Sequence, residues 1–225
     1  MKIITLTNSK YQFMCSKSIK SFLRFNDLPL DVYFYGSELE NTWLKDIKCH
    51  YIPSDNSKMP KECRWYPRIL KEKLKIFAEQ TEDFFFFEPD VFFYKKLDFS
   101  IFKDGISGPR ICDYNGSYSY GEYYTHLMNA GFLCFKNVKP FNIEDIEKYF
   151  NPNTPYPDED FLFIYKDLFN FLDLDICFLN YPHRPFVANP IAVHCVGRYK
   201  PFINCFEDPE KQNHYHYNKI MSLGL

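Results

Sequence analysis

The stretch Glu82–Phe93, EDFFFFEPDVFF, places four consecutive phenylalanines directly before the acidic step Glu88-Pro89-Asp90. An apolar run without alternation predicts a strand that is covered on both faces and is therefore central in its sheet. Pro89 cannot donate a ladder hydrogen bond and favours extended geometry at Glu88, so the strand is expected to stop or bend there. Residues two apart in an extended chain project to the same side. We therefore expect the carboxylates of Glu88 and Asp90 to face one point at the end of this strand.

The rest of the chain has the pattern of an α/β protein. An apolar strand at 2–8, a helical pattern at 15–25 and a second strand at Asp31–Gly36 form a βαβ opening, which predicts a parallel sheet. A helix with one apolar stripe is expected at Tyr66–Thr81. Further strands are expected at 104–111, 130–136, 173–180 and 189–193, and further helices at 142–150, 158–169 and, as an exposed tail, 211–221.

No repeat or low-complexity linker divides the chain. We therefore expect one domain, residues 1–225, with a single Rossmann-like, mostly parallel central sheet flanked by helices.

Composition argues against nucleic acid as a partner and against a membrane span. The 225 residues carry 27 basic and 29 acidic side chains, and this net charge of −2 gives no electrostatic footprint for nucleic acid. No stretch approaches the roughly 20 apolar residues of a transmembrane segment, and the N-terminal apolar run is too short for a signal peptide. The eight cysteines are widely spaced, and several lie in apolar strands, so we expect buried free thiols. A soluble cytoplasmic protein is expected, with peripheral contact to a membrane left open.

The step Glu88-Pro89-Asp90 has two interpretations, a ligand-binding site and an ordinary turn. Ligands of open α/β sheets bind at the carboxyl ends of strands, and two converging carboxylates suit a divalent cation that also holds a diphosphate. An ordinary polar turn is the alternative. The later segment HCVGRYKPF adds His194 for a metal, Gly197 for close approach to an oxyanion, and Lys200 for phosphate charge. An isolated histidine is more often a structural residue than a ligand.

Six segments, in order along nearly the whole chain, resemble the GT-A-fold glycosyltransferases, especially glycosyltransferase family 8, which includes glycogenin and bacterial lipopolysaccharide galactosyl- and glucosyltransferases. The segments are TLTNSKY, YPRILKEKL, FFFFEPDVFF, MNAGFLCF, PDEDFL and HCVGRYKPF. The resemblance implies a GT-A fold and transfer of a hexose from a nucleoside-diphosphate sugar, with UDP as the expected nucleotide. It further implies a carbohydrate or glycolipid hydroxyl as acceptor, Mn²⁺ or Mg²⁺ as cofactor, and retention of the anomeric configuration.

The resemblance also assigns the metal and diphosphate ligands. Glu88 and Asp90 occupy the family's Asp-x-Asp positions, and His194 occupies the third metal-ligand position. Lys200 resembles the lysine that grips the diphosphate, with Gly197 in the same segment.

The remaining assignments concern the nucleotide sugar. Asp158 would bind sugar hydroxyls, and Glu159 would lie on the reacting face, where it could stabilise an oxocarbenium-like cation or act as nucleophile. The expected donor contacts are Thr5, Thr7, Asn8 and Tyr11 at the base and ribose, Arg68 near the sugar-diphosphate, and Asn129, Ala130 and Gly131 beside the sugar.

The chain departs from the family at two charged positions. Glu88 stands where the family usually has Asp, so its carboxylate reaches one methylene further and the position or affinity of the metal can differ. Glu159 replaces the usual Gln, so a carboxyl group stands where the family carries an amide. The segment between Asp90 and Asn129 is also shorter than in many relatives, which would open the acceptor side.

Alternative functions make different demands on the sequence. A nucleotidyltransferase would need a glycine-rich basic loop after the first strand, and TLTNSKYQ contains no glycine. A non-catalytic nucleotide- or carbohydrate-binding module would not need the metal ligands and Lys200 together. The tyrosine-rich segment 112–124 is either an acceptor platform or a solvated turn. A zinc site could draw on four residues whose spacing matches no compact pattern, namely Cys195, Cys205, His214 and His216.

Overall fold

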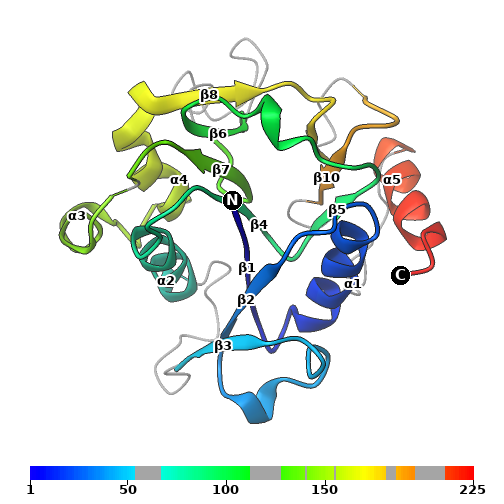
Figure 1. The fold of residues 1–225 in the computed structure, drawn as a ribbon, viewed down its shortest axis with the longest axis horizontal. Coiled ribbons are helices and arrows are strands. Elements are labelled where there is room, and N and C mark those ends of the chain that lie inside the picture. The colour runs from blue at the N-terminus through cyan, green and yellow to red at the C-terminus, as the bar shows by residue number, and fades with distance from the viewer. Residues whose placement is uncertain (54–66, 112–127, 140, 155, 181–185, 196–210) are drawn as a thin grey trace.

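The structure is a computed structural model, and the residues it describes are 1–53, 67–111, 128–139, 141–154, 156–180, 186–195 and 211–225. Its main element is a seven-stranded sheet in that part of the chain (Figure 1). The strand order is β3 (Cys49–Ile52), β2 (Leu30–Tyr35), β1 (Lys2–Asn8), β4 (Phe84–Phe87), β7 (Phe132–Lys136), β6 (Gly105–Pro109) and β8 (Phe169–Leu172).

The sheet is mostly parallel, as the βαβ opening predicted. Four of its six strand pairs are parallel, and β7 is antiparallel to both of its neighbours. The phenylalanine strand β4 takes the middle position of the seven, which confirms that it is central.

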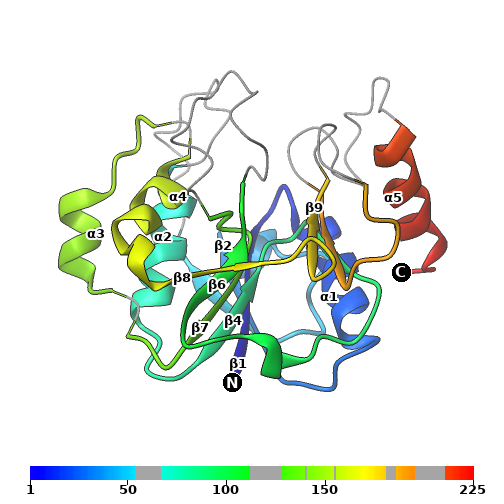
Figure 2. The same cartoon turned by 90° about the horizontal axis from the view of Figure 1, so that it is seen from above.

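Helices cover both faces of this sheet (Figure 2). On one side lie α2 (Pro67–Ala78), α3 (Ile143–Tyr149) and α4 (Pro157–Leu162). On the other side lie α1 (Gln12–Leu23) and α5 (Lys211–Ser222), together with a second sheet of order β5 (Val91–Phe93), β10 (Ala192–His194) and β9 (Cys177–Leu179). Short 3-10 turns occur at Glu38–Glu40, Phe99–Ile101 and Phe163–Leu168.

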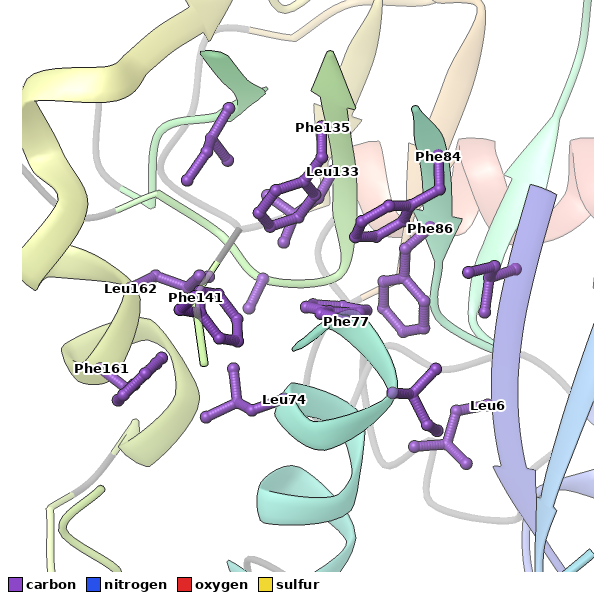
Figure 3. Packing of buried hydrophobic residues seen from close by; sticks show 14 of the residues in the cluster. Leu6, Leu74, Phe77, Phe84, Phe86, Leu133, Phe135, Phe141, Phe161 and Leu162 are labelled. Atoms are coloured by element: carbon purple, nitrogen blue, oxygen red, sulfur yellow. The ribbon is translucent and has the colours of Figure 1, made fainter. Parts of the chain in front are cut away.

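The four phenylalanines of β4 alternate between the two faces and so join two separate cores. Phe84 and Phe86 meet Phe77 of α2, with ring centroids 5.4 and 4.9 Å away (Figure 3). Phe85 and Phe87 face the opposite side, where Phe87 packs 5.3 Å from Phe22 of α1. Complete burial of such a side chain contributes about 1.5–3 kcal/mol. The run therefore fixes the sheet between its two helical layers.

The proline step directs the chain from one sheet into the other. The Val91 amide donates to the Glu88 carbonyl at 3.1 Å, so Pro89 and Asp90 are the central residues of a β-turn. The turn delivers β5 to β10, where His194 is paired with Val91 in antiparallel register. One local turn thus brings a residue from near the C-terminus beside two acidic residues in the middle of the sequence.

Three sequence predictions differ from the structure. The helix predicted at 158–169 ends at Leu162, and a 3-10 segment then leads into β8 at Phe169, because residues 169–172 pair with β6 at the edge of the sheet. The edge strands β3 and β8 were not predicted, since both are short and mixed in polarity. The C-terminal helix is not simply exposed, because His216 and Ile220 on α5 are completely buried.

The described cysteines agree with the expectation of buried thiols outside disulfides. Cys15, Cys134, Cys177 and Cys195 are buried, whereas Cys49 is half-buried. None of the described helices has the length and apolar character needed to cross a membrane.

Candidate active site

Glu88, Asp90 and His194 converge where β4 turns into β5. Oε2 of Glu88 and Oδ1 of Asp90 lie 3.3 and 3.2 Å from Nε2 of His194. One ligand atom from each of the three residues lies within 4.8 Å of the others. Two carboxylates and an imidazole at this spacing are a donor set that fits Mn²⁺ or Mg²⁺. The convergence expected for the acidic step is present, while occupation by a metal stays a prediction.

Asn129 orients the imidazole of His194. Oδ1 of Asn129 lies 2.9 Å from Nδ1 of His194 and also accepts the Gly131 amide at 3.1 Å. Its Nδ2 group donates to Glu159 at 3.0 Å, which fixes the direction of the amide. Nδ1 of His194 is therefore the donor of that bond, and Nε2 faces the carboxylates as the atom that would bind a cation.

The two carboxylates also control the protonation of His194. Burial lowers the pKa of His194, but Asp90 and Glu88 outweigh burial and raise it to about 9. A cation that binds Nε2 must therefore displace a proton from this nitrogen.

Lys73 of α2 is a buried cation in the site, and the sequence analysis did not identify it. Its Nζ group donates to Oε1 of Glu88 at 2.9 Å and to the Ala130 carbonyl at 3.3 Å, and it forms an ion pair with Asp158. The side chain is 2 % exposed. Burial alone would lower the pKa of Lys73, but Asp158 and Glu88 raise it, so the ammonium group stays charged. Glu88 thus offers one oxygen to Lys73 and the other to His194.

A signal for Lys73 was present in the sequence. It lies four residues from both Ile69 and Phe77, in the middle of the apolar stripe of α2. A charged residue in such a position requires a buried partner, because an unpaired buried charge is very costly. Arg68, the basic residue singled out from the sequence, lies one and a half turns earlier and is half-buried. Its contact with a sugar-diphosphate stays a prediction.

Gly131 leaves room for the metal ligands. A Cβ atom at this position would collide with Cε1 of His194 and would lie 2.8 Å from Oε2 of Glu88. The Gly131 carbonyl also accepts the Glu88 amide at 2.8 Å. The glycine therefore permits the close approach of His194 and Glu88, a role distinct from the sugar contact expected from the sequence.

The first strand ends at the same edge of the sheet as β4, because β1 and β4 are parallel neighbours. Asn8 uses its Oδ1 to accept the amides of Lys10 and Tyr11 at 3.0 and 3.2 Å, which shapes the turn into α1. Thr5 and Thr7 are almost completely buried, whereas Tyr11 is half-buried beneath the ammonium group of Lys10. Their contacts with a nucleotide remain predictions.

Several predicted residues lie outside the described part of the chain. These are Gly197 and Lys200 of the phosphate-binding segment, the tyrosine-rich segment 112–124, and Cys205 of the alternative zinc site. Of the other residues considered for zinc, His216 places Nδ1 3.1 Å from the Tyr94 hydroxyl.

Sequence comparisons find no relatives for this chain: no protein-family model matches it, and no curated protein matches it. Solved structures do share its fold. The galactosyltransferase LgtC, in complex with donor and acceptor sugar analogs, matches with a TM-score of 0.67 and 16 % identity over 99 % of this chain and 95 % of that chain. The glycosyltransferase GlyE of Streptococcus pneumoniae TIGR4 matches with a TM-score of 0.63 and 16 % identity over 99 % of this chain and 63 % of that chain.

A third match, the bifunctional glycosyltransferase WbbM, has a TM-score of 0.60 and 11 % identity over 89 % of this chain and 47 % of that chain. The chain therefore has the fold of these GT-A glycosyltransferases, which confirms the fold class expected from the sequence.

Proposed function

We propose that this chain is a metal-dependent glycosyltransferase that moves a hexose from a nucleoside-diphosphate sugar, with UDP as the nucleotide, to a hydroxyl group. The observation that carries the proposal is the convergence of Glu88, Asp90 and His194 at the carboxyl edge of a GT-A sheet. A binding module would have no need for a cation site linked through Lys73 to a second pair of acids.

The reaction would depend on charge that develops on the leaving diphosphate. Bound Mn²⁺ or Mg²⁺ would supply Lewis-acid stabilisation of that charge, held by Glu88, Asp90 and His194. Lys200 is proposed to add a positive charge at the same diphosphate, beside Gly197.

On the sugar side, Lys73 keeps Asp158 paired and in position to accept hydrogen bonds from sugar hydroxyls. Asn129, Ala130 and Gly131 form the adjoining wall of the site. Thr5, Thr7, Asn8, Tyr11 and Arg68 are the proposed contacts of the nucleotide and diphosphate.

The similarity of the fold to LgtC, a galactosyltransferase solved with donor and acceptor sugar analogs, supports a hexose donor and a sugar acceptor for this chain. We propose a carbohydrate or glycolipid acceptor, reached in the cytoplasm, and retention of the anomeric configuration.

Donor hydrolysis provides the direct test of this function. The purified chain is incubated with Mn²⁺ and, in turn, with each member of a panel of UDP- and GDP-hexoses, and the release of free sugar is followed. We expect slow hydrolysis of one or more UDP-hexoses, abolished by chelation of the metal and restored by added Mn²⁺.

Two results would speak against the proposal. Absence of metal-dependent UDP binding would remove the glycosyltransferase assignment. Tight UDP binding with no turnover of any sugar nucleotide, even with carbohydrate acceptors added, would favour a non-catalytic binding module on the same fold.

A further inference from the structure

Among the acidic residues of the site that the structure describes, Glu159 is the one for which no ion pair is found. It lies in the first turn of α4 and is 6 % exposed. Its neighbour Asp158 is paired with Lys73, and Glu88 and Asp90 face His194. A buried carboxylate without a cation is costly, and such a group usually binds a proton instead.

The hydrogen bonds show which oxygen of Glu159 would hold that proton. Oε1 accepts two N–H groups, from the Asn129 side chain at 3.0 Å and from the Ala130 amide at 3.3 Å. Oε2 is buried and, within the described residues, has no hydrogen-bond partner. An oxygen that accepts two donors behaves as the carbonyl oxygen of the acid, which leaves Oε2 to carry the hydrogen.

The charged groups that surround Glu159 favour the same protonation state. Burial is the largest influence and raises the pKa of Glu159, and the negative charge of Asp158 raises it further. Lys73 of α2 and the Ala130 amide lower the pKa of Glu159, whereas Glu88, the residue directly after β4, raises it. The net direction is upward, because burial and the charge of Asp158 outweigh Lys73, whose ammonium group also pairs with Glu88 and Asp158. His194 is connected to Glu159 by hydrogen bonds through Asn129.

We propose that Glu159 works as a neutral acid whose Oε2–H donates a hydrogen bond to an oxygen of the bound donor sugar. This inference rests on the proposed function and adds a defined role for one residue. A protonated glutamic acid has the shape of glutamine, with Oε1 as acceptor and Oε2–H in the place of one amide hydrogen. A protonated Glu159 therefore offers the same acceptor and donor positions as a glutamine side chain would.

The neutral-acid role excludes the two roles that the sequence analysis considered for Glu159, namely nucleophile and stabiliser of an oxocarbenium-like cation. A neutral carboxyl group is not a nucleophile, and it carries no charge to stabilise an oxocarbenium-like ion. Charge stabilisation on this side of the sugar falls to Asp158, which Lys73 holds in place.

Conservative replacement tests this role in the donor-hydrolysis assay. We expect Glu159→Gln to retain activity within about tenfold of the unchanged chain, and Glu159→Ala to lose about 100-fold or more, as for removal of one preorganised donor. Glu144→Gln, at an exposed position in the first turn of α3, serves as the control without effect. A loss of about 1,000-fold or more in Glu159→Gln, with the unchanged chain active, would overturn the proposal.

The pH dependence gives a second readout. The neutral acid is the active form, so the activity ratio of the unchanged chain to Glu159→Gln should be constant at low pH and fall as pH rises. A ratio that increases with pH would indicate an active carboxylate.

Infrared spectroscopy tests the protonation state without any turnover. The difference spectrum between the unchanged chain and Glu159→Gln, recorded at neutral pH, should contain the carbonyl band of a protonated acid. A difference made up only of carboxylate bands would refute the neutral acid. Failure of the proposed function has another signature, since the unchanged chain would then show neither hydrolysis nor metal-dependent UDP binding while the infrared result still stands.

Discussion

The two acidic pairs of the site, Glu88 with Asp90 and Asp158 with Glu159, consist of the same side chains in different surroundings. The first pair follows β4, faces the imidazole of His194 and shares Lys73. In the second pair, at the start of α4, Asp158 forms an ion pair with Lys73, whereas Glu159 accepts hydrogen bonds from the Asn129 side chain and the Ala130 amide. The partners, and not the residue types, determine which carboxyl group carries charge and what it can bind.

The first pair has the geometry to hold a cation, and the second pair is the one that we propose to contact the sugar. Lys73 joins them, because its ammonium group lies between Glu88 and Asp158. We make four predictions that test the difference between the two pairs, and the first concerns Lys73, which contacts both of them.

Replacement of Lys73 by Met should have the largest effect. It leaves Glu88 and Asp158 without their shared cation, and removal of one partner from a buried ion pair costs about 3–5 kcal/mol. The free energy of unfolding, measured with urea, should fall by this amount. Lys71→Met is the matched control on the same helix, because Lys71 forms an exposed pair with Glu147 at 2.6 Å and should cost no more than about 1 kcal/mol. Equal losses in the two variants would show that Lys73 does not join the pairs.

Asp90→Asn should remove a ligand from the first pair only. We expect the affinity for Mn²⁺, measured by calorimetry, to fall at least about 100-fold, because a neutral amide replaces a carboxylate ligand. Asp83→Asn is the control, since Asp83 lies just before the other end of β4, where its side chain accepts the Asn137 amide at 2.7 Å. Unchanged metal affinity in Asp90→Asn would remove Asp90 from the cation site.

Gly131→Ala should disturb Glu88 of the first pair and His194, because the added methyl group needs the space that these side chains occupy. The added Cβ would meet His194 and Glu88, so we expect Mn²⁺ affinity to fall about tenfold, in the range of changes that disturb ligand orientation. Gly108→Ala is a crowded but milder control, because its Cβ would lie 2.8 Å from Leu133 and 2.9 Å from both Met128 and the Phe132 carbonyl, none of which is a proposed metal ligand. It should lower stability without a change in metal affinity. Unchanged Mn²⁺ affinity in Gly131→Ala, with reduced affinity in Gly108→Ala, would show that Gly131 is not needed for the close approach of His194 and Glu88.

The protonation of Glu159 should appear as a small pH dependence of stability. Its pKa is raised in the folded chain, whereas in the unfolded chain it is about 4.3. Between these two values the folded state binds more protons, so the free energy of unfolding should fall as pH rises, by at most about 1.4 kcal/mol per pH unit. Below the unfolded pKa this difference vanishes. Urea titrations of the unchanged chain and Glu159→Gln at several pH values should show this slope only in the unchanged chain. Parallel curves would mean that Glu159 has no raised pKa.

Sequence reasoning found the first pair more completely than the second. Glu88 and Asp90 follow a run of phenylalanines and stand two residues apart, and the turn at Pro89 is local, so their convergence followed from the chain itself. Lys73 was missed because it lies among apolar residues on a helix otherwise predicted correctly. The hydrogen bonds around Glu159 were also missed, since they come from Asn129 and Ala130, thirty and twenty-nine residues away.

The local elements could be predicted from the order of the residues: the central strand of phenylalanines, the proline turn after it, and the βαβ opening of the parallel part of the sheet. These follow from side-chain periodicity and backbone restriction, which act over a few residues. The location of β8, the buried face of α5 and the partners of each buried carboxyl group became known from the folded chain. Those outcomes depend on desolvation and on partners from distant segments, and a buried charge acquires its state only when the chain has folded around it.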